Sequence, residues 1–257
     1  MMYLIVCLVA SLASCLTFFT GFGLGTLLMP ALALFFAVEV AVAMTAVVHL
    51  LNGVFKLILV GREVHVGVVL RFGVPAILAA LAGAWVLLWL AQLPVLHTYA
   101  AFDRTFVMTA TGVGVGVLML LFALVELAPG TRKLAIHPRY LPLGGVVSGF
   151  FGGLSGHQGA FRSAFLVRSG LGPASFVATG AAIALLIDLA RLSLYLPRLL
   201  ALDWQANGPV VGAAVASAFA GAFIGAQLLE KVTLRGLQLA VAGLLFVIAA
   251  ALIAGAI

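Results

Sequence analysis

Long apolar runs separated by short polar connections cover almost the whole chain. They lie at about residues 2–20, 40–60, 68–91, 105–127, 174–196, 208–229 and 237–257, and the stretch from Gln92 to Arg104 is a partly amphipathic connection. Runs of this kind are long enough for a helix to cross a hydrocarbon core of about 30 Å. The pattern therefore predicts an all-α, polytopic helical membrane protein.

Two glycine-rich segments break this pattern at matching places in the two halves of the chain. The first is residues 21–25 and the second is residues 152–156. Irregular backbone within a bilayer leaves N–H and C=O groups without partners, at a cost of several kcal/mol for each group. Paired interruptions are typical of transporter binding sites, where protein, water or a ligand satisfies those groups.

The two halves follow one plan, which predicts two pseudo-symmetric repeats that each begin with a broken helix. Thr45 falls near Thr179, and Lys56 falls near Arg191, when the halves are aligned. One span and one short half-helix around each break gives about eight transmembrane helices. Parallel and inverted repeats both remain open. The predicted divisions are a first transmembrane repeat over 1–128, a polar linker over 129–140 and a second repeat over 141–257.

Composition and charge agree with a membrane protein that has no soluble domain. The 257 residues are 65% hydrophobic and 8% charged, against about 25% charged in soluble domains. The net charge of +6 comes from scattered residues, not from a basic stripe interleaved with aromatics, so nucleic acid is not an expected partner. The expected partner is the lipid bilayer.

Basic residues beside three connections predict the orientation of the chain. In an eight-span arrangement these residues lie on one side, which the positive-inside bias makes cytoplasmic together with both termini. The three groups are Lys56, Arg62 and Arg71; Arg132, Lys133 and Arg139; and Arg191 and Arg198.

The glycine breaks also suggest a binding site, because a glycine-rich turn that opens a helix directs free N–H groups and the positive end of the helix dipole at one point. Arg162 either binds an anion there or extends to the membrane interface. His157 either contacts the substrate, relays a proton or packs against a backbone carbonyl. The candidate substrate-binding residues are Gly23, Gly25, Thr26, Asn52, Ser155, Gly156, His157, Gln158 and Arg162.

A second group of polar residues lies on helical faces of two aligned spans. His49, Asn52 and Lys56 are spaced i, i+3 and i+7, on one face of an apolar segment. Asp188 and Arg191 are spaced i, i+3, so they form either a structural ion pair or part of a substrate site. The candidates for proton coupling or charge are His49, Lys56, Asp188 and Arg191.

Motifs for enzymatic chemistry are missing from the sequence. The five histidines show no paired metal-ligand spacing, so a metal site is not expected. No Walker sequence, nucleophile elbow or zinc-protease motif occurs. The chain is therefore expected to be no enzyme, with no catalytic residues and no cofactor. Transport would then be driven by a gradient or run downhill.

The paired breaks, Pro30 and above all the stretch from Gly152 through His157-Gln158 and Arg162 to Leu166 resemble the sulfite exporter TauE/SafE family. The resemblance implies a permease with two related halves in the inner membrane of a bacterium. Its substrate would be a small sulfur-containing or organic anion, such as sulfite or a sulfonate, with proton coupling as one option. The alternative is a membrane-embedded partner subunit without transport of its own. Homo-oligomerisation is left open.

Overall fold

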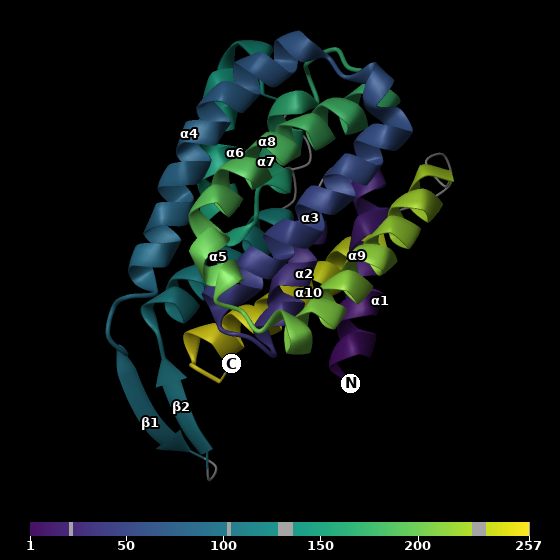
Figure 1. Cartoon of the computed structure of the whole chain (residues 1–257). Helices are drawn as coiled ribbons and strands as arrows, with labels where there is room; N and C mark the ends of the chain where they lie inside the picture. The colour runs from purple at the N-terminus through teal and green to yellow at the C-terminus, as the bar shows by residue number, and fades with distance from the viewer. Residues whose placement is uncertain (21–22, 102–103, 128–135, 228–234, 257) are drawn as a thin grey trace.

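Helices make up nearly all of the computed structural model, which describes residues 1–20, 23–101, 104–127, 136–227 and 235–256 (Figure 1). The described helices are α1 (Met2–Thr20), α2 (Leu24–Ala33), α3 (Val38–Val60), α4 (Val66–Leu90), α5 (Ala110–Leu127), α6 (Leu141–Ser155), α7 (Gly159–Leu166), α8 (Pro173–Leu200), α9 (Trp204–Gln227) and α10 (Arg235–Ile253). Two short 3-10 turns, η1 (Gly61–Glu63) and η3 (Pro138–Tyr140), precede α4 and α6.

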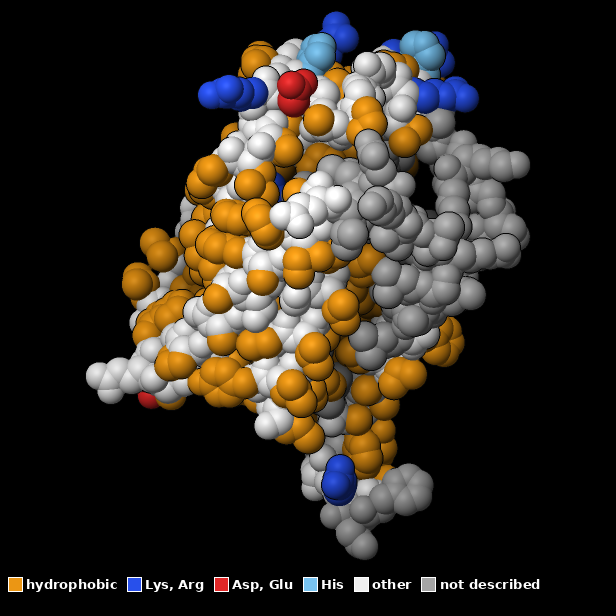
Figure 2. All heavy atoms as spheres, turned by 90° about the vertical axis from the view of Figure 1, so that its right-hand side faces the viewer, with side chains coloured by type: hydrophobic (Ala, Val, Ile, Leu, Met, Phe, Trp, Pro, Cys, Tyr) orange, Lys and Arg blue, Asp and Glu red, His pale blue; other side chains and the backbone are white. Residues whose placement is uncertain are grey.

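The length and surface of the helices are those of an integral membrane protein. Within the described residues, α3 with η1, α4, α8 and α9 are long and apolar enough to span a bilayer. Large apolar side chains such as Ile58, Leu78 and Trp85 are exposed on their outer faces. Figure 2 shows hydrophobic side chains spread over one flank of the molecule, whereas most of the Lys, Arg and His side chains visible on this face gather at one end.

Each glycine break separates two helices that fold back on each other. α2 returns along α1, and Gly23 at this turn has a φ of 148° and packs against the α1 backbone at Ala13. α7 contacts α6 in the same way after Gly156, which has a φ of 82°. Only glycine adopts such positive φ values without strain. Residues 21–22 of the first break lie outside the described residues.

Helices from the two halves of the chain pack in pairs. α4 lies along α6, α1 along α9, α3 along α8 and α5 along α10. The α4–α6 contact is made by backbone, because a Cβ placed on Gly145, Gly149 or Gly153 would lie 2.1, 2.2 or 2.1 Å from a carbonyl oxygen of α4. Glycines at this spacing allow membrane helices to approach closely. Gly116 on α5 and Gly221 on α9 likewise pack against the backbone carbonyls of Ala249 and Ser11.

One predicted connection and the start of the helix predicted after it form β-strands instead. The connection over 92–104 and the helix starting at 105 are replaced by an antiparallel hairpin of β1 (His97–Ala101) and β2 (Arg104–Met108), and α5 starts at Ala110. Paired Tyr99 and Phe106 stack with ring centroids 5.0 Å apart, and the Tyr99 hydroxyl donates to the carbonyl of Ala254. Cross-strand aromatic pairs of this kind stabilise a strand pair. The rest of the described chain is the predicted helical membrane protein.

The predicted grouping of basic residues is only partly correct. Lys56 and Arg191 are buried. Arg198 lies in the last turn of α8, whereas η1 contacts the first turns of α8, next to the hydrogen bond between Thr179 and His65. Both termini lie toward the end opposite the one where most Lys, Arg and His side chains gather (Figures 1 and 2). Most of the predicted linker falls on residues 128–135, outside the described residues. The count of eight spans and the repeat boundaries stay predictions.

Candidate functional site

A buried cavity lies where the two glycine breaks meet. A Cβ on Gly25 would lie 2.6 Å from the carbonyl oxygen of Gly156, so the two turns touch. The cavity volume is about 40 Å³, space for about three waters or one small anion at roughly 10–15 Å³ for each water. Its described lining residues are Thr17, Gly23, Gly25, Thr26, His49, Asn52, Gly53, Lys56, Gly156, Gln158, Gly159, Arg162, Leu166, Phe176, Val177, Gly180, Ala181 and Ala184.

Two helix N-termini converge on this cavity. The first turn of α2 contributes Gly25 and Thr26, and α7 begins at Gly159, which also lines the cavity. The first N–H groups of a helix have no partner within the helix, and they carry the positive end of its dipole. Both breaks therefore present hydrogen-bond donors and positive potential to one cavity.

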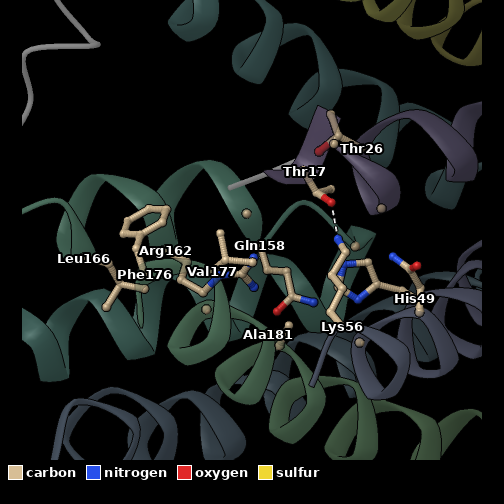
Figure 3. A pocket seen from close by; sticks show the side chains of 18 residues that line it. Thr17, Thr26, His49, Lys56, Gln158, Arg162, Leu166, Phe176, Val177 and Ala181 are labelled. Atoms are coloured by element: carbon tan, nitrogen blue, oxygen red, sulfur yellow. Dashed lines mark hydrogen bonds between the residues drawn. The ribbon is translucent and has the colours of Figure 1, made fainter. Parts of the chain in front are cut away.

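Two buried cations line the same volume. The side chain of Lys56 comes from α3 and that of Arg162 from α7, and both residues are buried. Lys56 donates to the hydroxyl of Thr17 in the last turn of α1, where a cation also favours the helix dipole (Figure 3). No acidic side chain is among the described residues that line the cavity.

Asp188 organises the polar side chains beside the cavity. Its Oδ1 accepts from Arg191 Nε at 3.0 Å and Arg191 Nη2 at 2.7 Å, and its Oδ2 lies 2.6 Å from His49 Nδ1. Arg191 also donates to the carbonyl of Gly152 at the end of α6. The structural ion pair between Asp188 and Arg191 is therefore confirmed. It anchors His49, which does line the cavity.

Gln158 connects this ion pair to the cavity. Its amide Nε2 donates to Asp188 Oδ1 at 3.3 Å, and its backbone carbonyl accepts from the Ser148 hydroxyl at 2.8 Å. Its amide Oε1 is buried and has no hydrogen-bond partner in the described structure. Figure 3 shows the side chain extending toward Lys56 and His49, with Arg162 beyond it on the other side.

His157 lies next to the cavity but does not line it. Its Nδ1 is 3.1 Å from both the carbonyl and the hydroxyl oxygen of Ser155. The ring stacks on Phe122 of α5 at 5.0 Å between centroids. This geometry is the packed arrangement, bonded to a backbone carbonyl, that the sequence left open for His157.

Most of the predicted site residues meet at the cavity. Gly152 and Gly153 of the second break serve packing, against Ile187 and Ala80 respectively. Ser155, His157, Asp188 and Arg191 support the site from outside the lining, and a role in binding or coupling stays a prediction for all candidates. Those that line the cavity are Gly23, Gly25, Thr26, His49, Asn52, Lys56, Gly156, Gln158 and Arg162.

Several residues that line or support the cavity were not singled out from the sequence. Thr17 and Ser14 are polar residues spaced i, i+3 in the first apolar run, which is a readable signal; Ser14 donates to Asn52 Oδ1 at 3.0 Å. Tyr195 is fully buried, and its hydroxyl donates to the carbonyl of Gly153. Apolar lining residues such as Phe176 carry no such signal, because their position depends on helix packing.

Comparison with known proteins identifies the chain. No curated protein matches it. The family model described as sulfite exporter TauE/SafE matches residues 6–252, nearly the full chain. The match spans both glycine breaks, the cavity between them and the helices that enclose it. The chain therefore belongs to the sulfite exporter TauE/SafE family of membrane transporters.

Proposed function

We propose that the protein is a secondary transporter that binds a small sulfur-containing or organic anion, such as sulfite or a sulfonate, in the cavity between the two glycine breaks. One observation supports this proposal most directly. Two helix N-termini and the side chains of Lys56 and Arg162 face one buried cavity, and no acidic residue is in its described lining. Asn52, Thr26 and Gln158 add polar groups to the lining. We place the protein in the inner membrane of a bacterium.

The charge of the cavity supports an anionic substrate. Buried cations within a membrane protein are costly and mark substrate or ion pathways. An anion of four or five heavy atoms that enters the cavity would interact with both cations and with the N-termini of α2 and α7. A neutral apolar ligand would leave those charges without compensation.

The helix pairing supports two related repeats, and the directions of the two hairpins support an inverted topology. The α1–α2 and α6–α7 hairpins approach the cavity from opposite ends of the molecule (Figure 1). α9 packs on α1 as α4 packs on α6, while α3 packs on its counterpart α8 and α5 on its counterpart α10. Exchanging the two halves leaves this set of pairs unchanged. Substrate sites at the interface of inverted repeats are exposed alternately to each side of the membrane.

We further propose that His49 carries a coupled proton. The 2.6 Å contact between His49 Nδ1 and Asp188 Oδ2 orients the ring, and His49 lines the cavity. Histidine is the side chain that ordinarily exchanges a proton near neutral pH. A proton bound to His49 would then attract an anion beside the ring directly.

Flux of labelled sulfite and sulfonates into proteoliposomes tests the proposed function. Arg162→Gln should reduce saturable flux at least tenfold, because it removes a cavity charge. Arg168→Gln is the matched control, since Arg168 is exposed six residues farther along the chain. Equal flux for the two variants, or no flux from the wild-type protein, contradicts the proposal.

The alternative, a membrane-embedded partner subunit without transport of its own, makes a different prediction. Such a subunit would purify with a stable partner and show neither anion-dependent flux nor an anion-dependent rise in melting temperature. The cavity lined by Lys56 and Arg162 is better explained by transport.

A further inference from the structure

The buried acceptor of Gln158 constrains the chemistry of the ligand. Gln158 is 1% exposed, it lines the cavity, and its Oε1 has no hydrogen-bond partner in the described structure. Leaving a buried acceptor unpaired is costly, so a ligand that donates to it gains affinity over one that cannot.

The orientation of this amide is fixed by its surroundings. Nε2 donates to Asp188 Oδ1, so rotating the amide by 180° would set Oε1 against a carboxylate oxygen. Ser148 holds the Gln158 carbonyl, and a Cβ on Gly152 would lie 2.9 Å from Gln158 Cβ, so the side chain has little room to move. The cavity therefore keeps an acceptor at this position.

The polar groups around this acceptor are donors. Lys56 and Arg162 carry N–H groups, and Asn52 offers its NH₂ because its Oδ1 already accepts from Ser14. Protonated His49 would add a further donor, Nε2–H, because its Nδ1–H faces Asp188. The best ligand thus has several acceptor oxygens and one hydrogen to donate.

We propose that the site selects an oxyanion that retains one proton, so that its O–H donates to Gln158 Oε1 while its other oxygens face Lys56, Arg162 and the helix N-termini. This inference rests on the proposed function and narrows its substrate class. Hydrogen sulfite meets the requirement. Sulfate and simple alkyl sulfonates have no such hydrogen, and their oxygen lone pairs would face the Gln158 oxygen.

Two isosteric monoanions test this selection at mildly acidic pH. Methylphosphonate monoanion has one P–O–H group, whereas methanesulfonate has the same shape and charge but no donor. Calorimetric titration of the purified protein should show methylphosphonate binding about tenfold more tightly, the effect of about one hydrogen bond to a buried acceptor. In Gln158→Met, which removes the acceptor, the two affinities should converge.

A parallel titration with sulfite distinguishes failure of the proposed function from failure of the selection for a protonated oxyanion. If sulfite and both probes fail to bind, the proposed function fails and the inference with it. If sulfite binds but the two probes bind the wild-type protein equally, or neither binds, only the selection for a protonated oxyanion is overturned. A preference for methylphosphonate in the wild type supports the inference even where Gln158→Met does not fold, and a preference that persists in folded Gln158→Met contradicts it.

Discussion

Asp188 is the residue on which the polar interior depends. It bonds Arg191 one turn along α8, His49 from α3 and Gln158 at the start of α7. All four side chains are buried or nearly so. A buried charge pair of this kind adds little net stability, but removing one partner leaves the other uncompensated. Asp188 therefore positions two cavity residues without lining the cavity itself.

Asp188→Asn should lower the free energy of unfolding by about 3–5 kcal/mol, because Arg191 would stay buried without its counter-charge. Denaturant unfolding in detergent micelles measures this change. Glu63→Gln is the control, since Glu63 is an exposed carboxylate in η1. A loss in Asp188→Asn no larger than that of the control would contradict the structural role of the ion pair.

His49→Asn should separate transport from proton coupling. Asparagine can keep a donor near the position of Nδ1 and so retain the contact with Asp188, but it cannot exchange a proton. Proteoliposomes with the variant should transport sulfite down its gradient yet lose the acceleration caused by an imposed pH gradient. Acceleration equal to that of the wild type would exclude His49 as the coupling residue.

The sequence predicted local residue pairs better than long-range ones. The i, i+3 spacing of Asp188 and Arg191 gave an ion pair as one of two alternatives, because both residues lie on one face of one helix. The contact between His49 and Asp188 joins α3 and α8, and it depends on packing that periodicity does not determine. For the same reason the sequence could not place the His157 ring, which stacks on Phe122 of α5 beside the cavity.

At the scale of elements, glycines set the distance between helices as well as the breaks. Gly145, Gly149 and Gly153 bring the backbones of α6 and α4 into contact. This contact places the C-terminal end of α6, and with it the second glycine break, against α4. Glycine thus serves two purposes, close helix packing and backbone breaks, and its frequency in the sequence does not distinguish them.

Gly149→Ala should destabilise the protein by about 1–3 kcal/mol or more, because the new methyl group would meet the Ala76 carbonyl, which is rigid backbone. Gly212→Ala on α9 is the matched control, since nothing lies within 4 Å of its Cβ position. A helical Gly→Ala change in open space should be neutral or slightly stabilising. Melting temperatures in detergent compare the two, and equal values would refute close α4–α6 packing.

Element boundaries were predictable where apolar periodicity is long and were missed where strands are short. The helices on either side of each break follow from glycine placement. The hairpin over 97–108 was missed because its alternation of half-buried and exposed residues spans only five positions in each strand. Its aromatic and β-branched residues, such as Tyr99, Thr105 and Phe106, were the available signal.

For the whole molecule, the distribution of charge predicts an orientation that differs from the one expected from sequence. Four of the six exposed basic residues in the described chain lie at the end that holds η1 and η3, namely Arg62, Arg71, Arg139 and Arg168, whereas Arg104 and Arg198 lie elsewhere. The positive-inside bias places that end in the cytoplasm. Both termini and the β1–β2 hairpin then lie on the opposite side (Figure 1).

Single cysteines introduced into a variant lacking Cys7 and Cys15 test this orientation in intact cells. A membrane-impermeant maleimide should label Thr98→Cys, which is exposed in β1, and should not label Glu63→Cys in η1 until the cells are permeabilised. The reverse labelling pattern would place the basic end outside the cytoplasm.

The central claim is that one small anion binds where the two glycine breaks meet. Anomalous diffraction from crystals soaked in selenite, a heavier analogue of sulfite, tests it most directly. The account predicts a selenium peak inside the cavity, between the Gly25 and Gly156 turns and near Arg162. A selenium peak found only among the exposed arginines at the basic end, with the cavity empty, would contradict it.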